Sequence, residues 1–174
     1  EGKQNQLKLS KYHMSGIDEL YDGRSEEELV VKLEEKYEQL RSFNKIKEIP
    51  VPEHLAHILR PYQEHGYHWL NYLSEVGWGG ILADDMGLGK TVQALSMLDH
   101  YKKVNGSLRA IVICPTTLIY NWQNEVMKFT PSLSFHIHHG NTRSRNTEEL
   151  EKHNIIITTY GTLRSDVQLL MKIL

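Results

Sequence analysis

Residues 83–91 read Ala-Asp-Asp-Met-Gly-Leu-Gly-Lys-Thr (ADDMGLGKT), and this stretch decides the fold class of the chain. It follows the short apolar run 80–83 (GILA) and precedes apolar residues at helical spacing in 92–98. A strand, a glycine loop ending in Lys-Thr and a helix form the arrangement that binds nucleotide phosphates. The general pattern has glycine where this chain has Asp84. The alternative interpretation is a structural turn that holds no ligand.

The residue types in this loop suit a bound anion. Gly87 and Gly89 have no Cβ, so the backbone can adopt unusual dihedral angles and come close to a phosphate. The amides at the start of the following helix point toward an anion, and the helix dipole favours it. Lys90 is expected to reach the β- and γ-phosphates, and the hydroxyl of Thr91 is expected to hold Mg²⁺. We therefore predict a nucleotide site with Lys90 and Thr91 as its catalytic residues.

Composition narrows the class of protein. The 174 residues are 40% hydrophobic and 24% charged, with a net charge of −2, which is enough for one globular domain with a core. The near-neutral charge argues against a basic coat for nucleic acid, although backbone amides and hydroxyls can still hold phosphates. The first residues do not resemble a signal peptide, no apolar run is long enough to span a membrane, and Cys114 is the only cysteine. These features predict a reducing, cytoplasmic location without membrane contact.

The N-terminal part differs in composition from the rest, and we place a boundary between 1–48 and 49–174. Residues 1–24 form a polar leader, and Ser25 with the glutamates that follow begins an amphipathic helix over about 25–41. This helix either docks on another domain or lies against the core, and we prefer the core. Two prolines make residues 49–52 an extended connector.

From residue 61 onward, predicted helices alternate with short apolar runs. Helices are expected from about Pro61 to residue 76, from the glycine loop to about residue 104, over 116–129 and over 163–170. The expected buried side chains are Tyr62, Gly66, Trp69, Leu70, Leu73 and Val76 in the first helix and Leu118, Trp122, Val126 and Phe129 in the third. Strands are expected at 81–83, 110–114, 133–138 and 155–159, with a polar loop at 140–147. This alternation predicts an α/β fold with a parallel sheet covered by helices on both faces.

Five blocks in this order resemble the first RecA-like lobe of the SWI/SNF family of helicase-like ATPases, in helicase superfamily two. The match covers about residues 58–165. The N-terminal leader of this chain also resembles that of bacterial members. The blocks are Leu59-Arg60-Pro61-Tyr62-Gln63 with Gly66 and Trp69, then ADDMGLGKT, then Cys114-Pro115-Thr116-Thr117-Leu118 with Asn121-Trp122, then His139-Gly140, then Thr158-Thr159-Tyr160. The resemblance implies a P-loop NTPase fold, truncated here, preceded by a helical extension.

The resemblance also implies roles for individual residues, with ATP and Mg²⁺ as cofactors. Gln63 corresponds to a glutamine that reads adenine, where an amide can both donate and accept. The residues from Asp85 to Thr91 (Asp85, Met86, Gly87, Leu88, Gly89, Lys90, Thr91) correspond to the phosphate cradle, in which Asp85 orders the loop or lies near Mg²⁺. Two further blocks correspond to residues that face nucleic acid: Thr116, Thr117 and Asn121, then Thr158, Thr159 and Tyr160. The implied partners are double-stranded DNA, through the full-length parent, and the parent's second RecA-like lobe.

Hydrolysis requires more than a phosphate loop. It needs one carboxylate to hold Mg²⁺ and another to position the attacking water. The family carries this acidic block some residues after the Thr-Thr-Tyr motif, and the sequence has no such block before Leu174. We therefore expect a fragment of a larger ATPase that binds nucleotide without hydrolysing it and that self-associates through unpaired strand edges. The alternatives are a superfamily-two helicase that separates RNA or DNA strands and a non-catalytic interaction module.

Two further features are weaker indications of function. His136, His138 and His139 suggest a metal, but no cysteine or carboxylate lies at ligand spacing, so we do not expect zinc. Arg143 and Arg145 lie in the polar loop and could contact a DNA phosphate.

Overall fold

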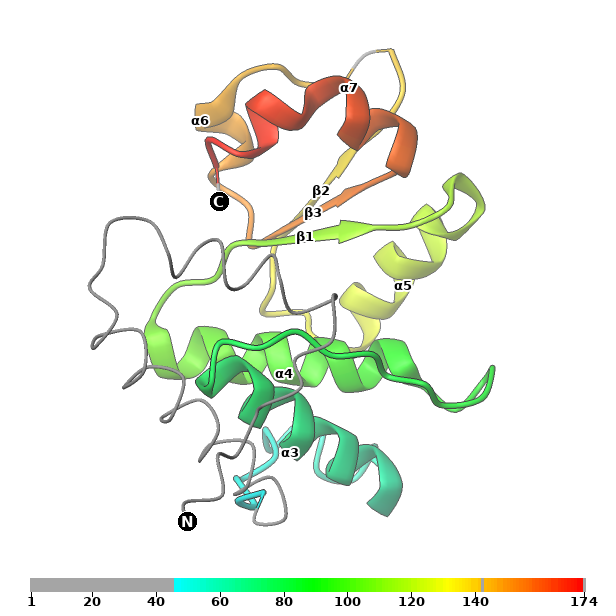
Figure 1. Cartoon of the computed structure of the whole chain (residues 1–174), viewed down its shortest axis with the longest axis vertical. Helices are drawn as coiled ribbons and strands as arrows, with labels where there is room; N and C mark the ends of the chain where they lie inside the picture. The colour runs from blue at the N-terminus through cyan, green and yellow to red at the C-terminus, as the bar shows by residue number, and fades with distance from the viewer. Residues whose placement is uncertain (1–45, 142, 174) are drawn as a thin grey trace, which may run out of the picture. The chain divides into compact units, whose positions relative to one another are not determined.

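The computed structural model describes residues 46–141 and 143–173, and the fold set out here is that of the unit Lys47–Leu174 (Figure 1). The predicted leader and the predicted helix over 25–41 lie outside the described residues. None of the helices in the described ranges is long and apolar enough to cross a membrane.

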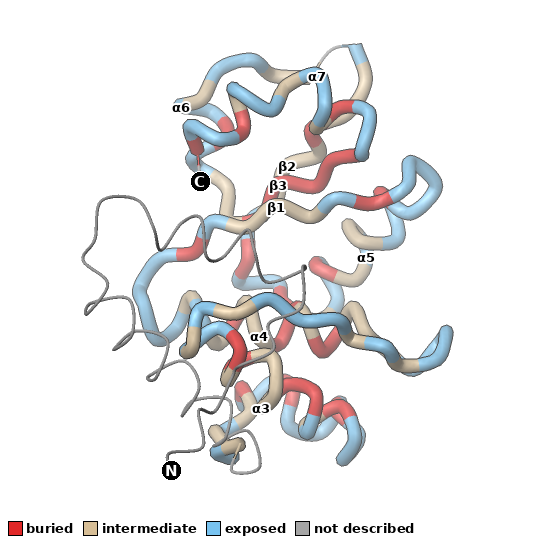
Figure 2. Tube along the Cα trace, in the orientation of Figure 1, coloured by how far each residue is buried: buried red, intermediate tan, exposed pale blue. Residues whose placement is uncertain are grey.

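The sheet is organised around β3 (Ile155–Thr158), which is buried along its whole length (Figure 2). It pairs in parallel with β1 (Ala110–Ile113) on one side and with β2 (Phe135–His138) on the other, in the order β1-β3-β2. Ala110 and Phe135 both lie opposite Ile155, so the three strands start level. A run of isoleucines suits this position, because a central parallel strand is covered on both faces.

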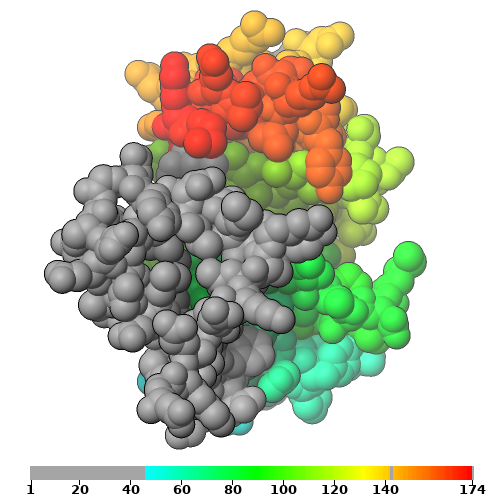
Figure 3. Space-filling model, in the orientation of Figure 1, coloured from blue at the N-terminus to red at the C-terminus, as the bar shows by residue number. Residues whose placement is uncertain are grey.

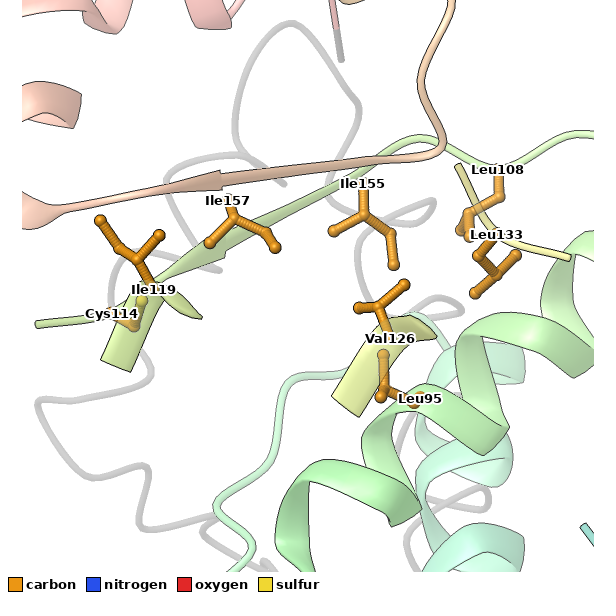
Figure 4. Close-up of a cluster of buried hydrophobic side chains, with 8 residues drawn as sticks. All are labelled: Leu95, Leu108, Cys114, Ile119, Val126, Leu133, Ile155 and Ile157. Atoms are coloured by element: carbon orange, nitrogen blue, oxygen red, sulfur yellow. The ribbon is translucent and has the colours of Figure 1, made fainter. Parts of the chain in front are cut away.

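Helices cover both faces of the sheet. Successive side chains of a strand point to opposite faces. Ile155 and Ile157 therefore point toward α4 (Lys90–Asn105) and α5 (Ile119–Phe129), where Figure 4 shows them above Leu95 and Val126. Ile156 points the other way, toward α6 (Thr147–Leu150) and α7 (Tyr160–Leu170), and packs with Leu150, Leu170 and Ile173. Complete burial of one such side chain contributes about 1.5–3 kcal/mol.

One more helix, α3 (Pro61–Glu75), lies on the far side of α4 from the sheet. It begins with a proline at its first position, where the missing N–H is not needed. Tyr67 of α3 is fully buried. It clusters with Leu55 and Leu59, which precede α3, and with Val92 of α4. α4 itself ends at Gly106, whose φ of 74° and N–H bond to the carbonyl of Lys102 close the last turn.

One asparagine joins the amino ends of all three strands. The Oδ1 atom of Asn154 accepts from the backbone N–H of Ser134 at 3.1 Å and from the ammonium group of Lys102 at 2.9 Å. Its Nδ2 atom donates to the carbonyl of Leu108 at 3.3 Å. Asn154 directly precedes β3, whereas Ser134 and Leu108 lie just before β2 and β1. The same side chain thus holds the amino end of each strand, together with the last turn of α4.

The predicted strand at 81–83 is not formed among the described residues. These residues have no ladder partner, and the side chain of Ile81 is 87% exposed. A strand is stable only beside another strand, and neither β1 nor β2 pairs with this segment. An apolar run of this length is compatible with a strand, but a strand forms only where a second strand pairs with it.

Other predicted boundaries and faces also required correction. A 3₁₀ turn, η3 (Thr116–Leu118), precedes α5 and leaves Leu118 44% exposed, so Ile119 is buried in its place. The last helix begins at Tyr160 instead of residue 163, and α6 occupies the end of the predicted loop. On α3 the buried side comprises Gln63, Gly66, Tyr67, Asn71 and Leu73, whereas Tyr62 is 40% exposed.

Candidate nucleotide-binding site

The glycine loop leads directly into α4. Gly87 and Gly89 have φ angles of 85° and 78°, a left-handed region that glycine enters without strain. Gly89 precedes Lys90, the first residue of α4, and makes no side-chain cap, so the first amides of the helix have no side-chain acceptor there. In Figure 3 the loop, in green, projects from the body of the described residues. The backbone therefore presents donors and a positive helix end at an exposed position.

Lys90 folds back onto the loop that precedes it. Its Nζ atom donates to the carbonyl oxygen of Asp84 at 2.6 Å and to that of Asp85 at 2.9 Å. Both partners are neutral main-chain groups, and a phosphate would offer the ammonium group a charged acceptor, which forms a stronger bond. Thr91, the residue next to Lys90, is half-buried in the first turn of α4. The predicted phosphate ligands thus lie together at one end of the helix.

Gln63 reaches the loop from α3. Its Nε2 atom donates to the carbonyl of Leu88 at 2.9 Å, and its Oε1 atom accepts from the N–H of Arg60 at 2.9 Å. The hydroxyl of Tyr62 donates to the same carbonyl of Leu88 at 3.1 Å. A side chain at position 89 would collide with the Gln63 amide, which is a second reason for Gly89. Gln63 is 8% exposed, so it is not a solvent-exposed helix glutamine.

An open cleft of about 530 Å³ adjoins this contact. It lies between the start of α3, the glycine loop and α5, and it is large enough for a nucleoside. The sequence patterns did not single out Lys128 or Glu125 of α5 in this cleft, because α5 meets the loop only through the fold. The lining residues are Ile58, Arg60, Tyr62, Gln63, Gly87, Gly89, Val92, Asn124, Glu125, Lys128 and Phe129.

The first block predicted to face nucleic acid follows β1. Thr116 and Thr117 lie in the exposed turn η3, and Asn121 is exposed in the first turn of α5. The Nδ2 atom of Asn121 donates to the carboxylate of Glu125 at 3.1 Å, so part of its amide has a partner on the same helix. The two threonine hydroxyls lie at the carboxyl end of β1.

The second block, which follows β3, is organised differently. Thr158 is fully buried and its hydroxyl donates to the carbonyl of His138 at 2.8 Å. Thr159 caps α7 by accepting from the N–H of Thr162 at 3.3 Å. Only Tyr160, 66% exposed, offers its side chain to the surface. The carboxyl ends of β1 and β3 are adjacent, so the structure brings Tyr160 to the same edge of the sheet as Thr116.

A half-buried ion pair lies beneath this second block. Asp166 accepts from Nη2 of Arg143 at 3.0 Å and shares a 2.9 Å hydrogen bond with Nε2 of the fully buried His138. The hydrogen bond from Arg143 is the main reason that the pKa of Asp166 falls to about 2, and the bond to His138 adds to it. Arg143, predicted as a candidate phosphate contact, is therefore committed to Asp166 and to the carbonyl of Gly140. Sequence reasoning missed Asp166, because its partners lie more than twenty residues away.

The histidines form no metal site among the described residues. The rings of His136 and His138 lie on one face of β2 with centroids 6.4 Å apart, as the strand period predicts. In residues 46–141 and 143–173 no three His, Cys, Asp or Glu side chains are grouped to hold a metal ion. Burial lowers the pKa of His136, which is consistent with a neutral core histidine.

The parallel sheet, the helices on its two faces and the loop at the start of α4 define the class: a RecA-like lobe. Comparison with known proteins gives the family. The SNF2-related domain family matches residues 62–174, and the chain belongs to this family.

Individual relatives agree with this assignment. The uncharacterized ATP-dependent helicase MG018 of Mycoplasma genitalium is 32% identical over 94% of the chain, and TATA-binding protein-associated factor mot1 of Schizosaccharomyces pombe is 33% identical over 78%. The SWI2/SNF2 ATPase core of Sulfolobus solfataricus, solved in complex with dsDNA, superimposes with a TM-score of 0.63 over 70% of the chain at 39% identity. The chain spans 16% of MG018, 8% of mot1 and 25% of the Sulfolobus core.

Proposed function

We propose that this chain is the ATP-binding part of the first lobe of an ATP-dependent translocase that moves along double-stranded DNA. The observation that carries the proposal is the exposed glycine loop, with Lys90 at the start of α4 and the nucleoside-sized cleft beside it. The Sulfolobus ATPase core that this fold matches was solved with duplex DNA, which supports DNA as the substrate of the parent.

The residues of the loop fit a nucleoside triphosphate. Its phosphates would take the amides of residues 87–91 and the ammonium group of Lys90, which would exchange its two carbonyl partners for a charged one. The adenine would occupy the cleft beside Tyr62 and Gln63. Thr91 would hold Mg²⁺, which neutralises charge on the phosphates when it is bound. Asp85 is exposed at the loop and would order it or lie near the ion.

We propose that the isolated chain binds ATP without hydrolysing it. β3 is followed by Thr159, Tyr160 and Gly161, and no pair of adjacent carboxylates stands in the residues after it. Such a pair is needed to hold the metal and position water, and an arginine is needed to stabilise charge on the γ-phosphate. In the proposed mechanism, other parts of the parent polypeptide supply these groups, the arginine coming from a second RecA-like lobe. ATP binding would close the two lobes and hydrolysis would reopen them.

Duplex DNA would lie at the carboxyl ends of β1 and β3. Thr116, Thr117 and Asn121 are exposed at the first, and Tyr160 and the amino end of α7 at the second. Hydroxyls, amides and helix amino ends hold phosphates without reading sequence, which suits movement along a backbone. Thr158 and Thr159 would act by fixing the start of α7, since both hydroxyls have partners within the fold.

Two further proposals concern the setting of the chain. We propose that it is cytoplasmic, which the single, buried Cys114 supports. We also propose that the isolated chain self-associates, because the outer edges of β1 and β2 are unpaired among the described residues and Ile81 is exposed. Sedimentation at micromolar concentrations tests this, and a clean monomer would contradict it.

The central experiment is titration of the chain with a fluorescent ATP analogue, with and without Mg²⁺. We expect saturable binding that Lys90→Ala weakens at least about tenfold, because a hydrogen bond to a charged group is lost. Lys103→Ala is the matched control, since it removes the same charge from an exposed position on the same helix. Equal affinity of the wild type and Lys90→Ala would contradict the proposal, and circular dichroism melts would show that each variant is folded.

A further inference from the structure

The carboxylate of Asp84 is held by a glutamine of α4. Asp84 occupies the position at which the general phosphate-loop pattern has glycine. Its Oδ2 atom accepts a hydrogen bond of 2.8 Å from Nε2 of Gln93, which lies one turn into α4. The same Nε2 atom lies 3.4 Å from the carbonyl of Gly89, at the other end of the loop. The amide of one side chain therefore contacts the residues that open and close the loop.

The surroundings of Gln93 fix its position. The side chain is fully buried, and its Oε1 atom has no hydrogen-bond partner within the described residues. The amino group must face Asp84, because an ionised carboxylate only accepts hydrogen bonds. On the opposite side, α3 places Gly66 against the amide, and a Cβ at position 66 would collide with Oε1. Gln93 therefore leaves one polar atom unpaired in order to hold the carboxylate, and Gly66 makes room for it.

We propose that Gln93 is a positioning residue for the nucleotide loop, which it holds in its binding conformation through the side chain of Asp84. This inference rests on the proposed function of the loop. Lys90 and Gln93 both bind Asp84, the first through the main-chain carbonyl and the second through the carboxylate. A phosphate draws Lys90 away. The bond from Gln93 then remains to connect the start of the loop with α4.

Charge gives Gln93 a second effect. An aspartate at the entrance of a phosphate-binding loop repels the ligand if its carboxylate turns toward the anion. The bond from Gln93 keeps the carboxylate of Asp84 on the flank of α4. The chain thereby tolerates an acidic residue where glycine is usual, and the backbone of the loop stays close to α4.

The test compares nucleotide affinity across a set of variants of the full chain. We expect Gln93→Ala and Asp84→Ala each to raise the Kd for the fluorescent ATP analogue, Gln93→Ala by about tenfold, as for loss of a hydrogen bond to a charged group. The double variant is expected to be no worse than Gln93→Ala alone. Asp84→Asn is expected to bind within about twofold of the wild type, because its Oδ1 atom can still accept from Gln93. Ser96→Ala is the control, since Ser96 is buried on the same helix and its hydroxyl donates to the carbonyl of Val92 within that helix.

Wild-type affinity in Gln93→Ala, or the same loss in Asp84→Asn as in Asp84→Ala, would overturn the inference. A second measurement does not need nucleotide. In denaturant unfolding, Asp84→Ala is expected to shift the midpoint in the wild-type chain and not in Gln93→Ala, because the two residues act as a pair. Additive shifts would overturn the inference even if the chain binds no nucleotide. Lys90→Ala reports separately on the proposed function, since it leaves the bond between Gln93 and Asp84 intact.

A final variant examines the packing that the proposal requires. Gly66→Ala is expected to lower the melting temperature, because its Cβ collides with Gln93. Adding Gln93→Ala is expected to remove that penalty by vacating the space. A Gly66→Ala variant as stable as the wild type, or a double variant with additive loss, would show that Gln93 does not occupy the position described.

Discussion

The glycine loop and the carboxyl end of β3 are both predicted to bind phosphates, yet they are built in opposite ways. In the loop, Lys90 donates to two main-chain carbonyls, and Ile81, just before the loop, is exposed. At the end of β3, the hydroxyls of Thr158 and Thr159 are bonded within the fold, above the ion pair of Asp166 and Arg143. The ammonium group of Lys90 in the loop bonds to neutral main-chain carbonyls, whereas Thr159 at the β3 end caps α7.

This difference separates two possible contributions of a motif: contact with a ligand and positioning of a neighbouring element. In the proposed function, Lys90 would act through the group that it offers to a ligand. A threonine at the end of β3 acts through the position that it gives to α7 and to its neighbour Tyr160. Substitutions should therefore divide by the partners of each side chain: those bonded within the fold should change stability, and those that face outward should leave it nearly unaltered.

The largest effect is expected in the sheet beneath the β3 end. Ile157→Ala should lower the free energy of unfolding by about 2–5 kcal/mol, because it leaves a cavity in a fully buried strand. Urea unfolding measures this. Val167→Ala on the exposed face of α7 is the control and should change stability by less than about 0.5 kcal/mol. Equal effects at the two positions would mean that the core around β3 is not packed as described.

Lowering the pH should destabilise the fold mainly through the ion pair of Asp166 and Arg143. The pKa of Asp166 is about 2 when folded and near its ordinary value when unfolded. A carboxyl group with a lowered pKa adds stability above its unfolded pKa and loses it as the pH falls through the folded pKa. We expect a loss of about 1 kcal/mol between roughly pH 4 and pH 2, because solvent near the pair screens part of the interaction. Urea unfolding across this range tests it, and Asp166→Asn should flatten the profile, whereas the exposed Glu75→Gln should not. An unchanged profile in Asp166→Asn would contradict the pair.

Adjacent residues of the Thr-Thr-Tyr motif should give unequal results. Thr159→Ala removes the cap of α7 and should cost about 1 kcal/mol of stability. Tyr160→Ala should change stability by less than about 0.5 kcal/mol, because its side chain is largely exposed. Thermal or urea unfolding of both variants decides this. If Tyr160→Ala were the more destabilising, the division between positioning and presenting residues would fail here.

The smallest effect is expected before the loop. Ile81→Ser should alter the unfolding of the monomer by less than about 0.5 kcal/mol, because the side chain is exposed in the described structure. Sedimentation of the same variant should show less self-association than the wild type. A large loss of stability at low concentration would instead show that residues 81–83 are paired within a monomer.

The sequence predicts regions whose partners lie nearby along the chain, and it fails where the partner is distant. The isoleucines of β3 and the Gly-Lys-Thr at the start of α4 identify their elements directly, since each depends on local pattern. The strand at 81–83 was wrong because strand formation depends on a neighbour, which pattern alone does not reveal. Leu118 was wrong because a 3₁₀ turn shifts the helical phase by one residue.

The same reason limits prediction of the candidate site. The loop residues form one continuous segment and could be identified together. Lys128 in the cleft, Gln93 behind Asp84 and Asp166 behind His138 could not, because each meets its partner through packing of separate elements. Their residue types are also common on helices, so no composition signal sets them apart. Roles of the site residues in binding stay predictions.

Asn154 has a consequence for engineering this fold. It bonds to the amino ends of β1 and β2 and lies at that of β3, while the two segments predicted to face nucleic acid follow the carboxyl ends of β1 and β3. Asn154 thus supports the strand register at the end of the sheet where no ligand is expected, in addition to the ladder pairs themselves. Changes to the segments that follow the strands leave the bonds of Asn154 in place, so we expect this end of the sheet to tolerate insertions and exchanges better than the amino end.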